Sequence, residues 1–125
     1  MKPLRLEHQL ARLVTLDLPR PPSINELWRY ERGRIHLSST YERWMSAADR
    51  ASIQKKPITI QDKWTAEILI LRTPRFDLDN LATKALFDWL KSREYVRSDH
   101  DCEGYMVSWG DAPGGCRVTI RPLEE

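Results

Sequence analysis

The chain has 125 residues, of which 41% are hydrophobic, and its formal net charge is +2. This size and composition predict one domain, residues 1–125, whose core needs neither disulfides nor a structural metal. Two cysteines without CxxC spacing argue against a zinc site and fit a reduced, cytoplasmic protein. The charged N-terminus predicts no signal peptide, and the longest aliphatic run, residues 68–71, is too short to cross a membrane.

The charges are unevenly distributed along the chain. Residues 1–63 contain 12 Lys and Arg against 7 Asp and Glu, whereas residues 64–125 contain 8 against 11. A basic half suits a polyanion and an acidic half suits a hard cation, so the pattern hints at metal-assisted work on nucleic acid, although by itself it is more often a merely solubilising surface charge. The five glycines are scattered, so no nucleotide-binding loop and no nucleotide cofactor are expected.

In the first half of the chain, residues 13–18 are predicted to form a strand that ends at the prolines 19, 21 and 22. A loop follows, and residues 34–37 form a second, short strand. Ser38 or Ser39 is expected to cap a helix that runs to about residue 55. Apolar side chains at helical spacing give this helix its buried face: Tyr41, Trp44, Met45, Ala48 and Ala51.

In the second half, residues 64–71 are predicted to form a central strand, and a second helix is predicted over residues 80–94. The buried face of that helix comprises Leu81, Ala85, Leu86, Trp89 and Leu90. Residues 105–109 and 117–120 are expected to pair as a hairpin around the Pro-Gly-Gly turn. The predicted fold is α+β (mixed α/β), a single small domain with a mixed sheet and two main helices covering one face.

Asp77 and Asp79 lie two residues apart, where the central strand has ended and the second helix is expected to begin. Two carboxylates, waters and a substrate phosphate would complete the oxygen shell that Mg²⁺ prefers. Asp99, after the second helix, is the natural third ligand, with Asp101 as the alternative. A competing interpretation is that Asp79 or Asn80 caps the helix and Asp77 is a solvated turn residue.

Lys84 follows these carboxylates by about one helical turn, where its ammonium group could stabilise charge that develops on a scissile phosphate. An ion pair with Asp88, four residues further on, explains it equally well.

A group of basic residues surrounds aromatic ones early in the chain and could bind phosphates and stack on an unpaired base. The basic residues are Arg20, Arg29, Arg32 and Arg34, and their neighbours are Trp28, Tyr30 and His36. The alternative is an ordinary basic loop with Trp28 in the core.

Taken in order, these segments resemble the RusA family of Holliday-junction resolvases. Residues 21–25 (PPSIN) are similar to that family's strand-exit motif, and residues 28–38 are similar to its basic hairpin. Residues 77–81 (DLDNL) and 84–88 (KALFD) are similar to its catalytic element. Residues 115–120 are similar to its closing strand. The similarity covers about residues 13–121.

The resemblance implies a RusA-like fold and a Mg²⁺-dependent endodeoxyribonuclease, with Mn²⁺ as an alternative metal. Such a hydrolase cleaves paired phosphodiester bonds in four-way junctions during DNA recombination and repair, in a host or a prophage setting. By resemblance, Asp77, Asp79 and Asp99 are metal ligands and Lys84 is a catalytic cation. The residues expected to bind branched DNA are Asn25, Arg29, Arg32, Arg34 and Arg75.

A homodimer is expected, because a junction needs two symmetric cuts and one chain carries one carboxylate cluster. One residue more separates Asn80 from Lys84 than in the family pattern, which would turn Lys84 by about 100° on an ideal helix. Two alternative functions therefore stay open: a catalytically inactive DNA-binding scaffold of the same fold, and a protein-interaction domain.

Overall fold

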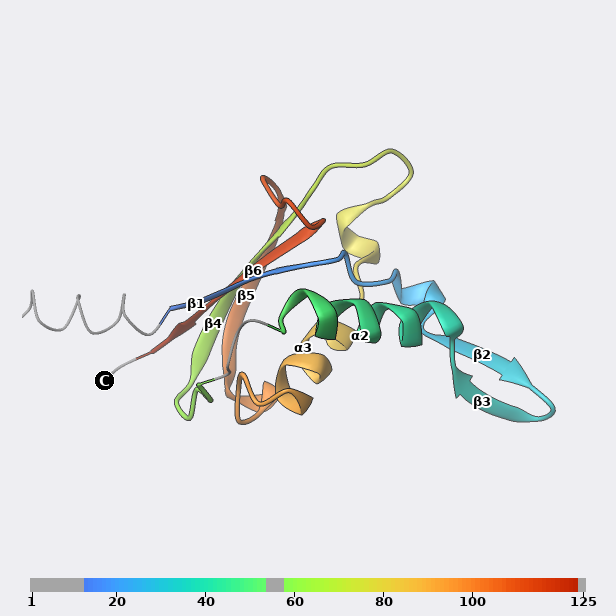
Figure 1. Ribbon diagram of the computed structural model, residues 1–125, viewed down its shortest axis with the longest axis horizontal. Helices are drawn as coiled ribbons and strands as arrows, with labels where there is room; N and C mark the ends of the chain where they lie inside the picture. The colour runs from blue at the N-terminus through green and yellow to red at the C-terminus, as the bar shows by residue number, and fades with distance from the viewer. Residues whose placement is uncertain (1–12, 54–57, 124–125) are drawn as a thin grey trace, which may run out of the picture.

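A mixed four-stranded sheet forms the centre of the computed structural model, which describes residues 13–53 and 58–123. The sheet has the order β1-β6-β4-β5, with β1 at Val14–Leu18, β4 at Trp64–Ile70, β5 at Cys102–Trp109 and β6 at Cys116–Pro122 (Figure 1). Strand β6 runs antiparallel to β1 and β4, and β4 runs parallel to β5. The predicted central position of β4 is confirmed.

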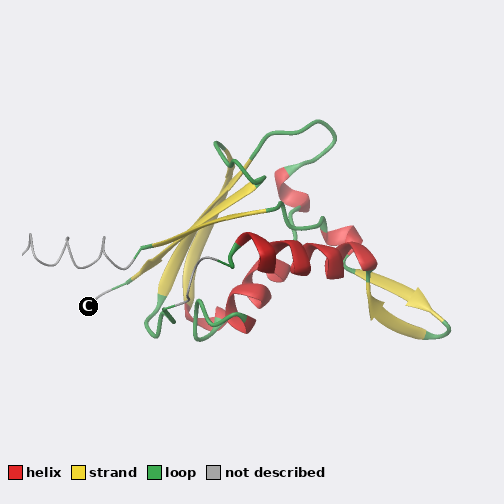
Figure 2. Cartoon of the chain, viewed as in Figure 1, coloured by secondary structure: helices red, strands yellow, loops and turns green. Residues whose placement is uncertain are grey.

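Two helices, α2 (Ser39–Ala51) and α3 (Thr83–Ser92), lie on one side of the sheet (Figures 1 and 2). Alternate side chains of β4 are buried, as expected for a strand with one covered face. These buried side chains pack with the apolar faces of both helices in one core. The described residues therefore form a small α+β domain of a mixed four-stranded sheet, two helices and a separate hairpin, as predicted.

Helix α2 begins as its sequence predicts and ends earlier. Ser38 is the N-cap, and its Oγ accepts a hydrogen bond from the backbone N–H of Tyr41 at 3.0 Å. Tyr41, Trp44 and Ala48 are buried. The prediction for Ala51 is wrong: it is exposed in the last turn, and Ser52 is buried instead. The predicted helix end near residue 55 lies outside the described residues.

Helix α3 begins at Thr83, three residues later than predicted. Residues Leu78–Asn80 form a 3₁₀ turn, η2, and Leu81 is extended with φ −62° and ψ 129°. The physical reason is tertiary: Leu81 forms an isolated β-bridge with Ser23, and the N–H of Ala82 donates to the carbonyl of Pro22 at 3.0 Å. This backbone pairing competes with helix formation. The apolar face predicted for this segment is nevertheless buried: Leu81, Ala85, Leu86, Trp89 and Leu90.

The predicted hairpin between residues 105–109 and 117–120 is wrong, because β4 lies between β5 and β6. Strand β4 has alternating buried side chains along its whole length and pairs on both edges, whereas β5 pairs only with β4 in the described chain. The Pro-Gly-Gly turn thus connects strands that are not neighbours. The unit β4-α3-β5 is a parallel crossover, in which a helix connects two strands of one sheet.

Cys102 and Cys116 are free thiols, as predicted. Cys102 pairs with Trp64 at one end of β4, and Cys116 pairs with Ile70 at the other end, so the length of that strand separates them. Burial, and secondarily the charge of Asp17, raises the pKa of Cys116 to about 12. No helix in the described ranges is long and apolar enough to cross a membrane.

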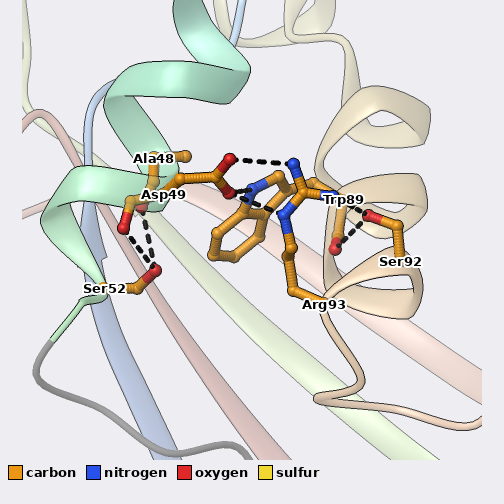
Figure 3. Close-up of polar contacts among 6 residues, drawn as sticks. All are labelled: Ala48, Asp49, Ser52, Trp89, Ser92 and Arg93. Carbon is orange, nitrogen blue, oxygen red and sulfur yellow. Dashed lines mark hydrogen bonds and ion pairs between the residues drawn. The ribbon is translucent and has the colours of Figure 1, made fainter.

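A polar network between α2 and α3 holds the two helices together (Figure 3). Asp49 accepts two hydrogen bonds from Arg93, at 2.6 Å from Nε and 2.9 Å from Nη2, and a third from Trp89 Nε1 at 2.9 Å. The hydrogen bonds from Arg93, supported by that from Trp89 and by the charge of Arg93, hold the pKa of Asp49 below its usual value against the opposing effect of burial.

We expect Asp49→Ala to lower the free energy of unfolding by about 1–3 kcal/mol, because it leaves Trp89 Nε1 and the guanidinium without their partner. A carboxylate with a lowered pKa stabilises the fold above its unfolded pKa, and this contribution is lost as the pH falls through the folded value. Urea unfolding of both proteins should therefore show the largest difference near pH 7 and a shrinking one below about pH 4. The surface substitution Glu42→Ala is the control, and a difference that grows on acidification would contradict the assignment.

Candidate functional site

Asp77 and Asp79 lie in an exposed turn, and their side chains do not stabilise any helix or turn of the described chain. Asp77 occupies the N-cap position of η2 without making a side-chain hydrogen bond, and the N-cap of α3 is Ala82. Neither carboxylate takes part in a hydrogen bond or ion pair among the described residues. The competing interpretation is wrong in that neither Asp79 nor Asn80 caps the second helix, whereas Asp77 is an exposed turn residue as that interpretation had it. Both carboxylates are available to a ligand.

The two motif-bearing segments meet at this turn. The bridge between Ser23 and Leu81, and the hydrogen bond from Ala82 to Pro22, join the segment before the hairpin to the segment after η2. Ser23 is fixed in turn by Glu26, whose Oε1 accepts from the Ser23 N–H at 3.2 Å and from its Oγ at 2.9 Å. A local hydrogen-bonded turn therefore positions the first segment against the second.

A hollow of about 610 Å³ opens where these segments meet, and we call it the motif hollow. Its wall comes from the 3₁₀ turn η1 (Ile24–Glu26), from η2, from the start of α3 and from β5. The lining residues are Ile24, Leu27, Leu78, Asp79, Leu81, Ala82, Thr83, Lys84, Tyr105 and Val107. One carboxylate and one ammonium group thus share an otherwise largely apolar concave surface.

Lys84 forms the ion pair with Asp88 that was weighed for it, while its catalytic role stays a prediction. Its Nζ lies 3.3 Å from Asp88 Oδ1, an i,i+4 ion pair, yet its side chain is 76% exposed and lines the motif hollow with Asp79. An exposed pair of this kind is weak, so it leaves the ammonium group free to move. The rotation of 100° assumed a continuous helix from Asn80 to Lys84, and this premise does not apply because Leu81 and Ala82 are not helical.

Asp99 and Asp101 lie in η3 (Asp99–Asp101), directly before β5. Asp101 accepts two hydrogen bonds from Arg97, at 3.1 Å and 2.9 Å, and forms an ion pair with it. Asp99 forms no ion pair in the described chain. The structure does not assemble a complete metal-ligand set: among residues 13–53 and 58–123, no group of three or more His, Cys, Asp or Glu side chains is placed to hold a metal.

Asp77 and Asp79 nevertheless fit a magnesium ion by their chemistry. Mg²⁺ commonly takes one or two carboxylates from a protein and completes its shell with waters and substrate phosphates. Two exposed carboxylates without hydrogen-bond partners, supplied by one turn, meet this requirement. The role of Asp99 as a third ligand stays a prediction.

The predicted basic segment is a two-stranded hairpin, β2 (Trp28–Glu31) and β3 (Arg34–Leu37), which projects from the body of the domain (Figure 1). Arg32 and Gly33 form its turn with φ values of 52° and 75°, as a two-residue type I′ turn requires. Trp28 is 57% exposed, so its placement in the core is wrong.

The hairpin register sorts its side chains onto two faces. Arg29 pairs with His36, and Glu31 pairs with Arg34, on a charged face. Trp28 pairs with Leu37, and Tyr30 pairs with Ile35, on an apolar face. Arg29 Nη1 lies 3.8 Å from Glu31 Oε2. With Arg32 at the tip, the arginines outnumber the single acid of the hairpin.

The other predicted DNA-contacting residues lie outside the hairpin. Asn25 is exposed in η1, and Arg75 is exposed in the loop between β4 and η2, where it follows Pro74 and adopts a φ of 66°. Arg20, grouped with the hairpin arginines in the sequence, lies elsewhere: its guanidinium stacks 3.9 Å from the centre of the Phe76 ring, and its Nη1 donates to Thr73 Oγ1 at 3.1 Å. It anchors that loop.

Sequence reasoning missed Tyr105 and Val107 as residues of the motif hollow. They lie on β5, whose side chains reach η2 only because β5 runs parallel to β4. The strand-helix-strand order of residues 64–109 was the signal that could have revealed this arrangement.

A scan against protein-family models and a search of curated protein sequences each found no match for this chain.

Proposed function

We propose that this protein is a Mg²⁺-dependent endodeoxyribonuclease of the RusA type, which cleaves phosphodiester bonds in Holliday junctions or related branched DNA. One observation carries the proposal: the two motif-bearing segments meet at a hollow that contains Asp79 and Lys84, beside a turn whose carboxylates have no hydrogen-bond or ion-pair partner among the described residues. Both the acids and the cation that metal-assisted phosphodiester hydrolysis needs are thus available at one surface.

In this proposal, Asp77 and Asp79 would hold one or two Mg²⁺ or Mn²⁺ ions, with Asp99 as the third ligand. The metal, when bound, supplies activation of a water and neutralisation of the leaving oxygen. Lys84 exchanges its weak pair with Asp88 for the non-bridging oxygens of the scissile phosphate, where its charge stabilises the transition state.

The DNA-binding surface in this proposal comprises the hairpin, η1 and the loop after β4. Arg29, Arg32 and Arg34 on the hairpin, Asn25 in η1 and Arg75 in the loop after β4 are all exposed. Arginine side chains on a projecting element suit phosphate contacts along a duplex arm. Such contacts predict binding that weakens steeply with monovalent salt.

Paired cleavage requires two active centres, and one chain supplies one candidate centre, at Asp77 and Asp79. We therefore infer a two-fold homodimer that acts in the cytoplasm in recombination or repair.

The proposal is tested by incubating an end-labelled four-way junction and a matched linear duplex with the protein in Mg²⁺ or in EDTA. We expect paired nicks in the junction, in Mg²⁺ only, from a protein with dimeric mass by light scattering. Junction-selective nicking by a monomer would overturn the dimer, and absence of nicking in both Mg²⁺ and Mn²⁺ would overturn the nuclease.

A second candidate is a junction-binding scaffold without turnover. The observation that favours it is the absence of a gathered three-acid group in the described residues, together with the pairing of Lys84 to Asp88. It predicts salt-sensitive junction binding, unaffected by Mg²⁺ and without product. A protein-interaction domain would show no salt-sensitive DNA binding at all.

A further inference from the structure

The apolar face of the hairpin presents exposed aromatic side chains far from the core. Tyr30 is 76% exposed and Ile35 is 69% exposed, and Trp28 is more than half exposed. Together with Arg29 they line a shallow hollow of about 550 Å³. Exposed aromatic side chains of this size are costly in water, so an exposed group of them indicates a binding surface.

We propose that Trp28 and Tyr30 form a stacking platform for unpaired DNA bases, so that the hairpin selects DNA that contains unstacked nucleotides. The inference rests on the proposed function in one respect, that the substrate is DNA. It adds that the substrate is recognised by the planar faces of its bases as well as by its phosphates.

The spacing of the two rings supports this occupant. Trp28 and Tyr30 lie two residues apart on one strand and point to the same face, so their Cβ atoms are separated by about 6.8 Å. That distance is about twice the 3.4 Å rise of a base in a DNA strand. Two side chains at this spacing leave room for one base between them, and we infer that the base stacks on their rings.

The charges of the hairpin also favour DNA over a second copy of this chain. Arg29 lines the same hollow as Trp28 and Tyr30, and Arg32 lies at the hairpin tip, with Glu31 as the only acid of the hairpin. Two hairpins docked through this hollow would bring Arg29 of both copies together, at a cost in repulsion. The platform offers on the order of 400 Å² of apolar surface, against about 800 Å² per partner in a stable interface.

Anisotropy with a fluorescently labelled duplex that carries three unpaired thymines, and with its fully paired counterpart, tests the inference. Measurements in EDTA, in an Asp79→Asn background, exclude cleavage from the readout. We expect Trp28→Ala with Tyr30→Ala to weaken binding of the unpaired probe by about 5- to 100-fold, and to change binding of the paired probe less than twofold.

Three controls make the result specific. Ile35→Ala removes apolar surface from the same face without removing a ring, so binding of the unpaired probe should change little. Trp28→Phe with Tyr30→Phe keeps both rings and should retain the preference for it. Arg29→Ala should weaken both probes equally and reduce the salt dependence.

Two outcomes would overturn the inference. Equal weakening of both probes by the double alanine variant would show that the hairpin contacts only the backbone. A fall from dimeric to monomeric mass in that variant would show that the face joins two copies of the chain. The nuclease proposal is tested separately. A wild-type protein that prefers DNA with unpaired bases but does not nick it would support the stacking platform and contradict the nuclease.

Discussion

Asp79→Asn is expected to reduce Mg²⁺-dependent cleavage of a four-way junction by about 100-fold or more. The substitution keeps the shape of the side chain and removes its negative charge, so the affinity of the turn for a divalent cation falls. Because Asp79 is exposed and makes no hydrogen bond in the described chain, the fold should be unaffected. Single-turnover cleavage rates and junction affinity in EDTA would separate a loss of chemistry from a loss of binding.

The matched control for Asp79→Asn is Glu67→Gln. Glu67 is an exposed acid on β4, on the sheet face opposite to the helices, and its substitution removes the same charge. It should leave the cleavage rate within about twofold of wild type. Equal rates for Asp79→Asn and wild type would contradict the assignment of the active centre, and weaker junction binding by Asp79→Asn in EDTA would show that Asp79 acts in DNA binding instead.

Trp64→Ala is expected to lower the free energy of unfolding by about 3–5 kcal/mol. Trp64 is fully buried at the start of β4, its ring lies edge-to-face with Phe87 at 5.2 Å, and its Nε1 donates to the carbonyl of Ser98 at 3.1 Å. The substitution opens a cavity and removes one of two hydrogen bonds that this carbonyl accepts, the other being from the N–H of Asp101 at 3.3 Å. Because domains of this size are stable by only about 5–15 kcal/mol, much of the stability would be lost. Urea unfolding monitored by circular dichroism measures the change.

The same substitution at Trp28 is the natural comparison for Trp64. Trp28 lies on the projecting hairpin, so Trp28→Ala should change the free energy of unfolding by less than about 0.5 kcal/mol. A large destabilisation at Trp28 would contradict the exposed placement of the hairpin. If Trp64→Ala does not fold, Trp64→Phe, which retains an aromatic ring and loses the hydrogen bond and part of the buried ring volume, should still show an intermediate loss.

Periodicity in the sequence predicted the elements of the fold better than their pairing. The helical spacing of Tyr41, Trp44 and Ala48 identified one buried face, because side-chain periodicity depends on local geometry. The partner of β5 is decided by which strand can bury most apolar surface at the centre of the sheet, and that is a property of the whole chain. The Pro-Gly-Gly turn therefore predicted correctly that the chain reverses direction, and predicted wrongly that the two strands it connects pair with each other.

The sequence predicted which residues belong to the candidate site, and it did not predict the surface that they form together. The sequence singled out Asp77, Asp79 and Lys84, yet nothing local to those positions reveals that Ser23 pairs with Leu81 and forms the wall of the motif hollow. The amphipathic character of the hairpin also depended on its register, which follows from a two-residue turn at Arg32 and Gly33. From the sequence alone, the aromatic and the basic residues of the hairpin could not be assigned to separate faces.

The strand order also constrains how the chain can fold as it is synthesised. In the described residues β1 pairs only with β6, and Thr15 Oγ1 and Thr119 Oγ1, which face each other at 3.4 Å, are 104 positions apart in the sequence. Contacts between such distant positions slow folding, because a long loop must close before they form. Leu16 and Leu18, which are buried in the finished domain, have no partner strand until β6 has left the ribosome.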